Sequence, residues 1–324
     1  MKLIDEYGDY LVGVRNVRPA TVKNYSLSLR RIFYWIGKHP REITLEDVKR
    51  YFIQAKLDEM TINAQRSRQG ALRMFFRWYA PKAGIADPTA ELVVIREEIK
   101  YPDVLAPEDL VRMVAACDPT TEIGRRNAAL LCLLADTGIR AGEAALLRVG
   151  NVVPEGGNFV LVVPRYKSHE RRVPFAKLTE HSLIGETFLR YWAEIRYQKR
   201  WGQEHPLFER CSWNENLRGG PLNRIGIHYL VQRCANRARL EKHVTCHSFR
   251  HFFGTYAVLN GARLEEVQAL MGHVSIQTTM RYVHVAAVIS GKTASVATTG
   301  LSIPREESGW VDIWRKARKA ITKP

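Results

Sequence analysis

The sequence lacks the features of a membrane protein, a secreted disulfide scaffold or a disordered chain. Its longest apolar run, at residues 128–135, is far shorter than the roughly 18 residues of a membrane-spanning helix. Residues 1–6 do not form a signal peptide. The five cysteines are odd in number and show no C-x-x-C spacing, which argues against both a disulfide framework and a four-thiolate zinc site. We therefore expect a soluble, intracellular protein with buried free thiols.

The composition predicts a globular protein that binds nucleic acid. The 324 residues are 46% hydrophobic, which is enough for two domains with ordinary cores. A net charge of +16 and a pI near 9.8 attract polyanions over long range. An anionic membrane surface would also attract such a chain. Basic residues outnumber acidic ones in residues 1–100 and again in residues 101–324, so both parts can bind one polymer, and we expect no membrane partner.

The first part of the chain has a helical pattern throughout. Apolar residues recur at helical spacing within residues 4–36, a third helix is expected to start near Thr44, and a fourth to span residues 61–79. Basic side chains are frequent on these helices. Any one of them could be merely solvated, but as a group they are predicted to contact phosphates. The predicted DNA contacts are Lys23, Arg30, Arg31, Arg66, Arg68, Arg73 and Arg77.

A linker is expected after this helical block. Residues 84–90 contain glycine and proline, and charged sequence follows as far as Pro102. Farther on, strand signals occur only at residues 158–164 and 171–175, which predict a β-hairpin within helical sequence. The expected fold class is mainly α with a small β-sheet (α+β). We predict a helical DNA-binding domain at residues 1–87, a linker at 88–103, a catalytic domain at 104–300 and a tail at 301–324.

The T-G-I-R motif at residues 137–140 is the first that can carry chemistry. Arg140 follows a turn and precedes a predicted helix at residues 141–147, so its side chain lies at a helix N-terminus, where an anion is favoured. Cleaving a phosphodiester without a metal requires neutralising the charge of the transition state, which forked arginines do well. A single arginine is usually just solvated, so this motif indicates a phosphate site only together with the other motifs.

The H-S-F-R motif at residues 247–250 supplies a second arginine. His247 and Arg250 are three residues apart on a predicted helix, so both can reach one phosphate. Histidines at positions 243, 247 and 251 also have the spacing of metal ligands. The pattern lacks the glutamate of zinc proteases, and His243 precedes the expected helix start near Thr245, so no metal site is predicted.

His273 and Tyr282 lie in the segment that follows. Gly272 is expected to end an amphipathic helix, so that His273 projects out of that helix. A short helix beginning near Ser275 then carries Tyr282 in its next turn. A tyrosine at this place, beside Arg281, is better explained as a nucleophile than as a core residue. Neighbouring cations would help its phenol to lose a proton as it attacks.

Lys167 lies in the loop of the predicted hairpin. A lysine in such a loop is most often solvated. Its flexible stem can also reach a minor groove or a leaving group, and we predict that it is the general acid for a departing 5′ hydroxyl. Arg165, in the same loop, or a histidine is the alternative acid.

These motifs together resemble the tyrosine recombinase family, which includes phage integrases and Xer-type recombinases. The resemblance extends from the N-terminal helices to about Val285. It implies that the arginines bind the phosphate, that the lysine is the one on the β-hairpin, and that the tyrosine is the nucleophile. The implied catalytic set, in the family's order, is Arg140, Lys167, His247, Arg250, His273 and Tyr282.

The resemblance also implies a mechanism and partners. The two domains are expected to close as a C-shaped clamp around double-stranded DNA, with a 3′-phosphotyrosyl intermediate and strand exchange through a Holliday junction. No metal or other cofactor is expected, because the phosphotyrosine bond stores the energy for religation. We expect a monomer in solution and a homo-tetramer on a specific DNA site, with accessory DNA-bending proteins. The expected location is the cytoplasm, at the nucleoid, in a prokaryote or a phage or other mobile element.

Two other functions fit part of this pattern. A type IB topoisomerase uses similar chemistry but acts alone, and a catalytically silent DNA-binding regulator would need only the fold. The complete catalytic set disfavours the silent regulator, and the absence of sequence for a further arm-binding domain before the first helices favours a simple recombinase. The tail contains Trp310, Ile313 and Trp314, which could pack on a neighbouring protomer or on their own domain.

Overall fold

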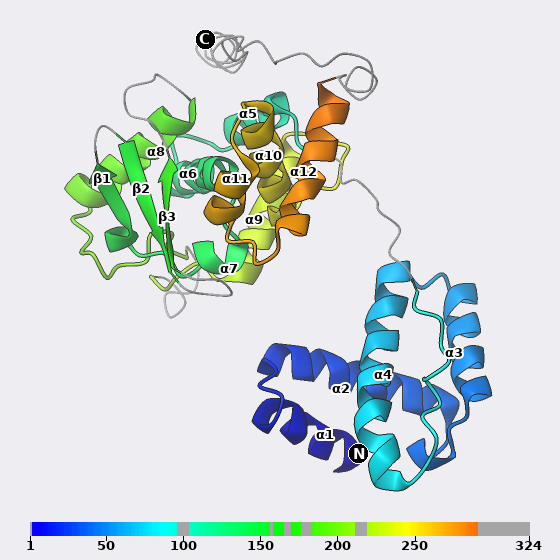
Figure 1. Cartoon of the computed structure of the whole chain (residues 1–324). Helices are drawn as coiled ribbons and strands as arrows, with labels where there is room; N and C mark the ends of the chain where they lie inside the picture. Colours follow the sequence, from blue (N-terminus) through cyan, green and yellow to red (C-terminus); the bar gives the residue numbers. More distant parts are fainter. Residues whose placement is uncertain are drawn as a thin grey trace. The chain divides into compact units, whose positions relative to one another are not determined.

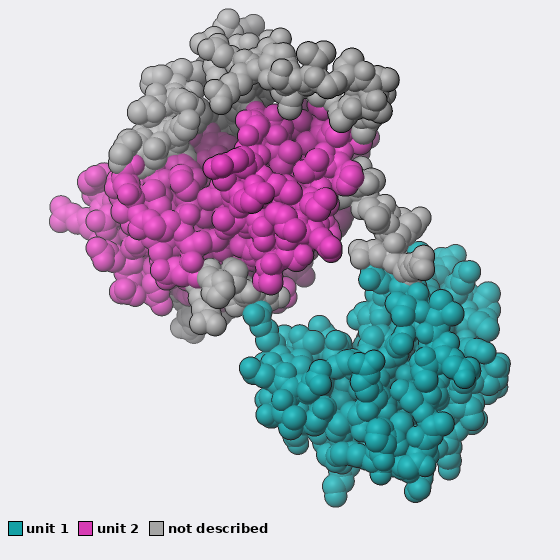
Figure 2. Space-filling view, viewed as in Figure 1, with its two compact units in different colours: residues 1–100 teal, residues 101–324 magenta. Residues whose placement is uncertain are grey.

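The chain divides into two compact units, Met1–Lys100 and Tyr101–Pro324, in a computed structural model that describes residues 2–95, 104–155, 158–164, 170–175, 183–210 and 219–290. Figure 1 shows the helices and strands of each unit, and Figure 2 colours the units separately. The boundary between them falls within residues 88–103, the segment predicted as a linker. Each unit has its own hydrophobic core.

Unit 1 is helical throughout its described part. It contains α1 (Lys2–Gly13), α2 (Pro19–Ile36), a 3-10 turn η1 (Pro40–Glu42), α3 (Leu45–Leu57) and α4 (Ile62–Ala83). Gly37 ends α2 in the left-handed conformation, with φ of 70°. Thr44 and Asp47 form a capping box at the start of α3, because each backbone N–H donates to the other side chain. Sequence signals therefore set both helix limits.

An aromatic core holds α1, α2 and α4 together. The ring of Tyr7 lies edge-on to that of Phe75, with centroids 5.3 Å apart, and Phe33 meets Phe75 in the same way at 5.1 Å. Edge-to-face contacts of this kind add to the free energy gained by burying the rings. The core fixes α2 beside α4, the two helices that carry the predicted DNA contacts.

The chain after α4 remains attached to that helix. The side-chain amide of Gln69 donates to the carbonyl of Val93 at 2.8 Å and accepts from the N–H of Ile95 at 3.0 Å. Arg73 donates to the carbonyl of Leu92 at 3.3 Å. Residues 92–95, within the predicted linker, are thus hydrogen-bonded to α4.

Unit 2 is arranged around a buried central helix, α6. The helices of its described part are α5 (Pro107–Ala115), α6 (Glu122–Thr137), α7 (Ala141–Ala144), α8 (Leu183–Ala193), which continues into a π-helical turn η3 (Glu194–Gln198), α9 (Arg224–Arg237), α10 (Cys246–Leu259), α11 (Leu264–Met271) and α12 (Ile276–Ile289). Residues 130–134 of α6 are inaccessible to solvent. Helices α5, α8 and α10 and strand β3 pack around α6, which lies between the sheet and α10–α12 (Figure 1).

The small sheet is antiparallel, in the order β1-β2-β3. Strands β2 (Asn158–Val163) and β3 (Arg171–Phe175) form the predicted hairpin, and the register pairs Val163 with Arg171. The expectation of strands only in this hairpin was wrong, because β1 (Val152–Glu155) pairs with β2. With only four residues, one of them Pro154, β1 gives a weaker strand signal than either strand of the hairpin. A proline cannot donate to a ladder, but it is tolerated at a sheet edge, where β1 lies.

Two helices differ in length from expectation. The predicted helix at residues 141–147 is only the single turn α7, after which the chain passes through a short 3-10 turn η2 (Val149–Asn151). The predicted short helix carrying Tyr282 is α12, which extends to Ile289. Its second half has two buried residues, Val285 and Ala286, so packing prolongs the helix where local signals were weak.

The described cysteines largely agree with the expectation of buried free thiols. Cys117, Cys132 and Cys234 are buried free thiols and Cys246 is half-buried, while Cys211 lies outside the described residues. Among the helices described, none combines the length and apolarity that a membrane crossing requires.

Candidate active site

Arg140 is positioned by the turn between α6 and α7. Gly138 ends α6 with φ of 58°, and a Cβ there would lie 2.6 Å from the ring of Phe253, so only glycine fits this turn. Arg140 follows as the N-cap residue of α7, and its side chain is 25% exposed. Its guanidinium donates to Glu143 Oε1 at 3.0 Å and to the carbonyl of Gly272 at 3.2 Å. The side chain is thus held from two sides.

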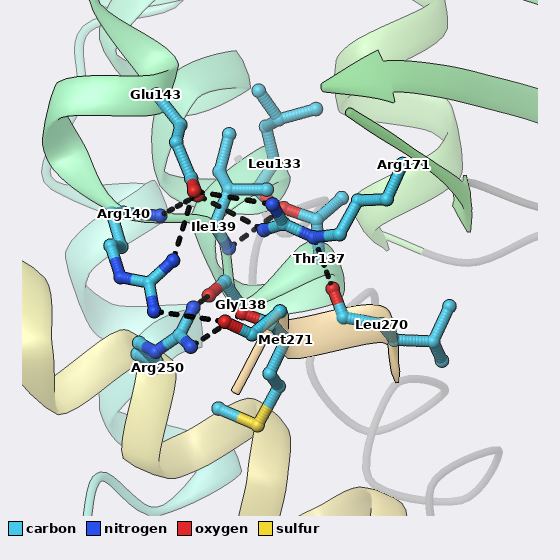
Figure 3. A network of polar contacts seen from close by, with 11 residues as sticks. Leu133, Thr137, Gly138, Ile139, Arg140, Glu143, Arg171, Arg250, Leu270 and Met271 are labelled. Carbon is cyan, nitrogen blue, oxygen red and sulfur yellow. Dashed lines mark hydrogen bonds and ion pairs between the residues drawn. The ribbon is translucent and has the colours of Figure 1, made fainter. Parts of the chain in front are cut away.

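Arg250 approaches the same place from α10. It is 3% exposed and donates to the carbonyls of Gly138 at 2.7 Å and Met271 at 2.6 Å (Figure 3). Burial, together with the charge of Arg140, lowers the pKa of Arg250 to about 10, which leaves it cationic at neutral pH. The structure therefore brings together the two predicted arginines, which bind adjacent carbonyls at the C-terminal end of α11.

Glu143 is the counter-ion of this cluster, and no role was predicted for it. The carboxylate is fully buried and accepts from the backbone N–H of Arg140 at 2.8 Å and from Arg171 at 3.0 and 3.1 Å. Burial alone would raise the pKa of Glu143, but the hydrogen bonds and charges of the two arginines outweigh burial and lower it. One carboxylate against the charges of Arg140, Arg171 and Arg250 leaves a net positive site that suits an anion.

His247 and His251 lie on α10 next to this cluster. Their rings are 5.2 Å apart, and the ring of His251 is 5.8 Å from that of Tyr282. Desolvation and the charge of Arg250 lower the pKa of His247. Burial and neighbouring charges lower the pKa of His251 to about 4. Both rings are therefore neutral at pH 7, so either can accept a proton.

His273 is held beside the tyrosine. Gly272 ends α11 in the left-handed conformation, with φ of 62°, as predicted. The next residue, His273, is half-buried, shares a 2.8 Å hydrogen bond with Thr279 Oγ1 and stacks on the ring of Tyr282 at 6.1 Å and 15°. Burial and nearby arginines lower the pKa of His273 to about 3. Thr279, which is fully buried and orients the ring, was not predicted as a site residue.

Tyr282 lies on α12 and is 2% exposed. Its ring packs against Gly254 of α10. Burial raises the pKa of Tyr282, while Arg250, Arg281 and Arg140 lower it by a smaller amount. The predicted effect of neighbouring cations is present but does not prevail. The phenol is therefore protonated in this state and has to lose its proton during attack.

The remaining predicted residues belong to unit 1 or are not among the described residues. Lys167, Arg165 and the tail with Trp310, Ile313 and Trp314 lie outside the described residues. Of the predicted DNA contacts, Lys23, Arg31 and Arg77 are exposed, while Arg30 pairs with Asp5, Arg68 donates to the hydroxyl of Tyr51, and Arg73 binds Leu92. Arg66 and Arg73 line one open groove of about 550 Å³ on α4.

A cavity of about 700 Å³ opens beside Arg140 and His247. One face of α9 lines its far side with Arg224, His228 and Gln232, which can donate or accept hydrogen bonds. Sequence reasoning missed this face, because polar residues at helical spacing normally indicate only a solvated surface. Within the described ranges, no three histidine, cysteine or acidic side chains are grouped as metal ligands would be.

Paired arginines within electrostatic reach of a buried tyrosine provide what phosphodiester transfer needs, and on this fold they define the class of tyrosine recombinases. The chain belongs to the phage integrase family. The model of that family matches residues 103–288, and the model of the phage integrase N-terminal SAM-like domain matches residues 3–83.

Individual relatives agree with this assignment. The chain is 30% identical to a tyrosine recombinase XerC of Oceanobacillus iheyensis over 287 residues, which cover 87% of this chain and 91% of the relative. It is 26% identical to a tyrosine recombinase XerD of Listeria monocytogenes over 289 residues, 87% and 94% of the two chains. Among solved structures, a lambda integrase dimer bound to a COC′ core site has a TM-score of 0.68 at 16% identity, covering 94% of this chain and 99% of that chain. XerH recombinase bound to a palindromic difH substrate has a TM-score of 0.67 at 20% identity, covering 88% and 82%.

Proposed function

We propose that the chain is a site-specific DNA recombinase that cleaves and rejoins duplex DNA through a covalent 3′-phosphotyrosyl bond to Tyr282. Residues 1–87 would bind DNA as the core-binding domain, residues 88–103 would link it, and residues 104–300 would catalyse. The observation that carries the proposal is the convergence of Arg140 and Arg250 on the end of α11, beside the buried Tyr282.

The chemistry follows from this arrangement. The hydroxyl oxygen of Tyr282 attacks the scissile phosphorus, the bond from phosphorus to the 5′ oxygen breaks, and the 5′ hydroxyl leaves with a proton. Arg140 and Arg250 stabilise the non-bridging oxygens in the transition state. His247, which is neutral at pH 7, would accept the phenolic proton, whereas the pKa of His251, at about 4, makes that ring a weak base. Lys167 would donate the proton to the leaving oxygen.

Rejoining is the reverse reaction with a different strand. A 5′ hydroxyl from the partner DNA attacks the phosphotyrosine and releases Tyr282, so no outside energy source is required. A related lambda integrase has been solved as a tetramer bound to a Holliday junction, which supports strand exchange by this chain through the same junction in a homo-tetramer. The proposed setting is the bacterial cytoplasm, at the nucleoid, with a monomer in solution and accessory DNA-bending proteins at the site.

Covalent capture tests this function and identifies the target sequence in the same experiment. The purified chain is incubated with a library of randomised duplexes and denatured, and DNA that remains attached to protein is amplified and sequenced. Tyr282→Phe is the control, because it removes the nucleophilic oxygen and no phosphate contact. We expect adducts and an enriched sequence with the wild-type chain and none with Tyr282→Phe, although DNA affinity should change little.

The same material separates the alternatives. Two recovered sites on one plasmid should give recombinant products that require several protomers. Relaxation of a supercoiled plasmid without recombinants would indicate a type IB topoisomerase instead. Binding without any adduct would indicate a silent DNA-binding regulator.

A further inference from the structure

Arg171 is a largely buried arginine outside the predicted catalytic set. It is the first residue of β3, and the alternation of the strand places it on the same inward face as Val173 and Phe175. Its side chain is only 10% exposed. An inward-facing charge on a strand needs a partner, and Glu143 provides it with both carboxylate oxygens.

Arg171 also binds the last turn of α11. Its Nε donates to the carbonyl of Leu270 at 2.7 Å. The next carbonyl, of Met271, accepts from Arg250, and the one after that, of Gly272, accepts from Arg140. The three successive carbonyls thus receive three different arginines, and Figure 3 shows those of Leu270 and Met271. The carbonyls that end a helix have no partner within it and carry partial negative charge, so this end of α11 is a natural support for cations.

Arg171 differs from the other two arginines in its hydrogen bonds. Each of its three side-chain nitrogens donates to an acceptor within the protein, two to Glu143 and one to Leu270. Arg171 therefore touches both supports of Arg140, namely the carboxylate of Glu143 and the turn ending at Gly272. Through the same turn it supports Met271, to which Arg250 is bonded.

We propose that Arg171 is a positioning residue of the strand-transfer reaction, which holds Arg140 and Arg250 in register for the scissile phosphate. This inference rests on the proposed function of the site. Lys167 lies four residues earlier in the sequence, in the loop of the same hairpin. Strand β3, which follows the proposed general acid, would therefore also align the arginines that bind the phosphate. One hairpin would then serve both leaving-group protonation and phosphate binding.

Substitution of Arg171 with a neighbouring control tests the proposal. Arg171→Lys keeps the charge but loses the planar fork that reaches Glu143 and Leu270 together, and Arg171→Ala removes both. Arg172→Ala is the matched control, because Arg172 has the same charge, is 58% exposed and pairs with Glu155 on the other face of the sheet. Single-turnover cleavage is measured at saturating protein on a duplex carrying the captured site, with affinity and thermal unfolding measured in parallel.

We expect Arg171→Lys to remain folded and to bind DNA within about threefold of the wild type, because the charge is retained. Its cleavage should be slower by about thirtyfold or more, and that of a folded Arg171→Ala by about a hundredfold, since misplaced reacting groups cost that much. Arg172→Ala should cleave like the wild type. Should Arg171→Ala fail to fold, Arg171→Lys decides the matter: cleavage at the wild-type rate would overturn the proposal.

A double-mutant cycle distinguishes positioning from general stabilisation. If Arg171 acts in part through Arg140, combining Arg171→Lys with Arg140→Ala should slow cleavage by less than the product of the two separate losses, because the effect that runs through Arg140 is already lost. Losses that multiply would show that Arg171 does not act through Arg140 and would overturn the proposal. These outcomes apply only if the wild-type chain forms the adduct. Absence of that adduct would instead contradict the proposed function itself. Failure of the proposed role of Arg171 and failure of the proposed function can therefore be distinguished.

Discussion

The ring of Tyr282 packs against the backbone of Gly254, leaving no room for a side chain. A Cβ built on Gly254 would lie 2.7 Å from Tyr282 Cε2 and 2.8 Å from Cζ. Helix α10 also carries His247, Arg250 and His251 within two turns of this glycine. The helix that carries the proposed phosphate-binding and proton-accepting groups is therefore also the surface that fixes the position of the proposed nucleophile.

We predict that Gly254→Ala slows cleavage by moving the nucleophile. Alanine favours the helix, but its methyl group overlaps the ring, so α12 has to shift, and a misplacement of about 1 Å can cost about a hundredfold in rate. Gly8→Ala is the control, since a Cβ there meets Val22 at an ordinary 3.4 Å in the middle of α1. Single-turnover cleavage and DNA affinity are the measurements. Wild-type cleavage by Gly254→Ala would mean that the ring is not fixed by this contact.

The two arginines should be equally important for chemistry and unequal for stability. Arg140→Ala and Arg250→Ala should each lower the cleavage rate by about 10²–10³, as expected for a lost transition-state donor, with a smaller effect on affinity. Arg250→Ala should lower the melting temperature more, because Arg250 is 3% exposed and its loss leaves the carbonyls of Gly138 and Met271 without that donor.

An exposed arginine of the same region serves as the control. Arg263→Ala removes an equal charge at the start of α11, where the side chain is 79% exposed. Its cleavage rate and melting temperature should stay near those of the wild type. Cleavage by either site variant within about tenfold of the wild type would exclude that arginine from the catalytic set.

The half-buried histidines His251 and His273 should make the folded state sensitive to acid. Burial and nearby cations hold the pKa of His273 at about 3 and that of His251 at about 4, below the ordinary value of about 6.5. Folding then releases protons, so the stability contributed by neutral histidines is complete above about pH 6.5 and is lost as the pH falls towards the folded pKa values. Urea unfolding of the full chain between about pH 7 and pH 5 measures this loss. His273→Gln and His251→Gln should each make the dependence shallower, and an unchanged slope would contradict the assigned pKa shifts.

Local signals predicted most of the fold that positions the site. Thr245 caps α10, and Gly272 ends α11, both where the sequence indicated, so helix limits predict that His247 lies near a helix start and His273 just after a helix end. Strand β1 was missed because it has only four residues, one of them a proline, and its pairing with β2 is a contact that local sequence does not reveal. The length of α12 depends on packing of Val285 and so was underestimated.

The sequence predicted the arginines and histidines of the site but not the residues that hold them in place. Arginines and histidines are recognisable by type and spacing, whereas the buried carboxylate of Glu143 and the inward charge of Arg171 meet across 28 positions of the sequence. Two signals were available. Glu143 occupies the third position of helix α7, where an acid can accept from the backbone N–H of the N-cap residue, Arg140. Arg171 lies on the same face of β3 as the core residues Val173 and Phe175. Neither signal indicates the partner, because that contact is tertiary.

Lys167 remains a prediction from the sequence, and the chemistry of the leaving group provides its test. Lys167→Ala should slow cleavage of a normal 5′-oxygen substrate far more than cleavage of a 5′-phosphorothiolate, because a thiolate departs without needing a proton. The two substrates share all phosphate and groove contacts, so a lysine that only binds DNA would slow both equally. Arg140→Ala is the comparison, because a lost phosphate contact should slow both substrates. Equal slowing by Lys167→Ala would exclude it as the acid and turn attention to Arg165, whose alanine variant should then show the selective loss.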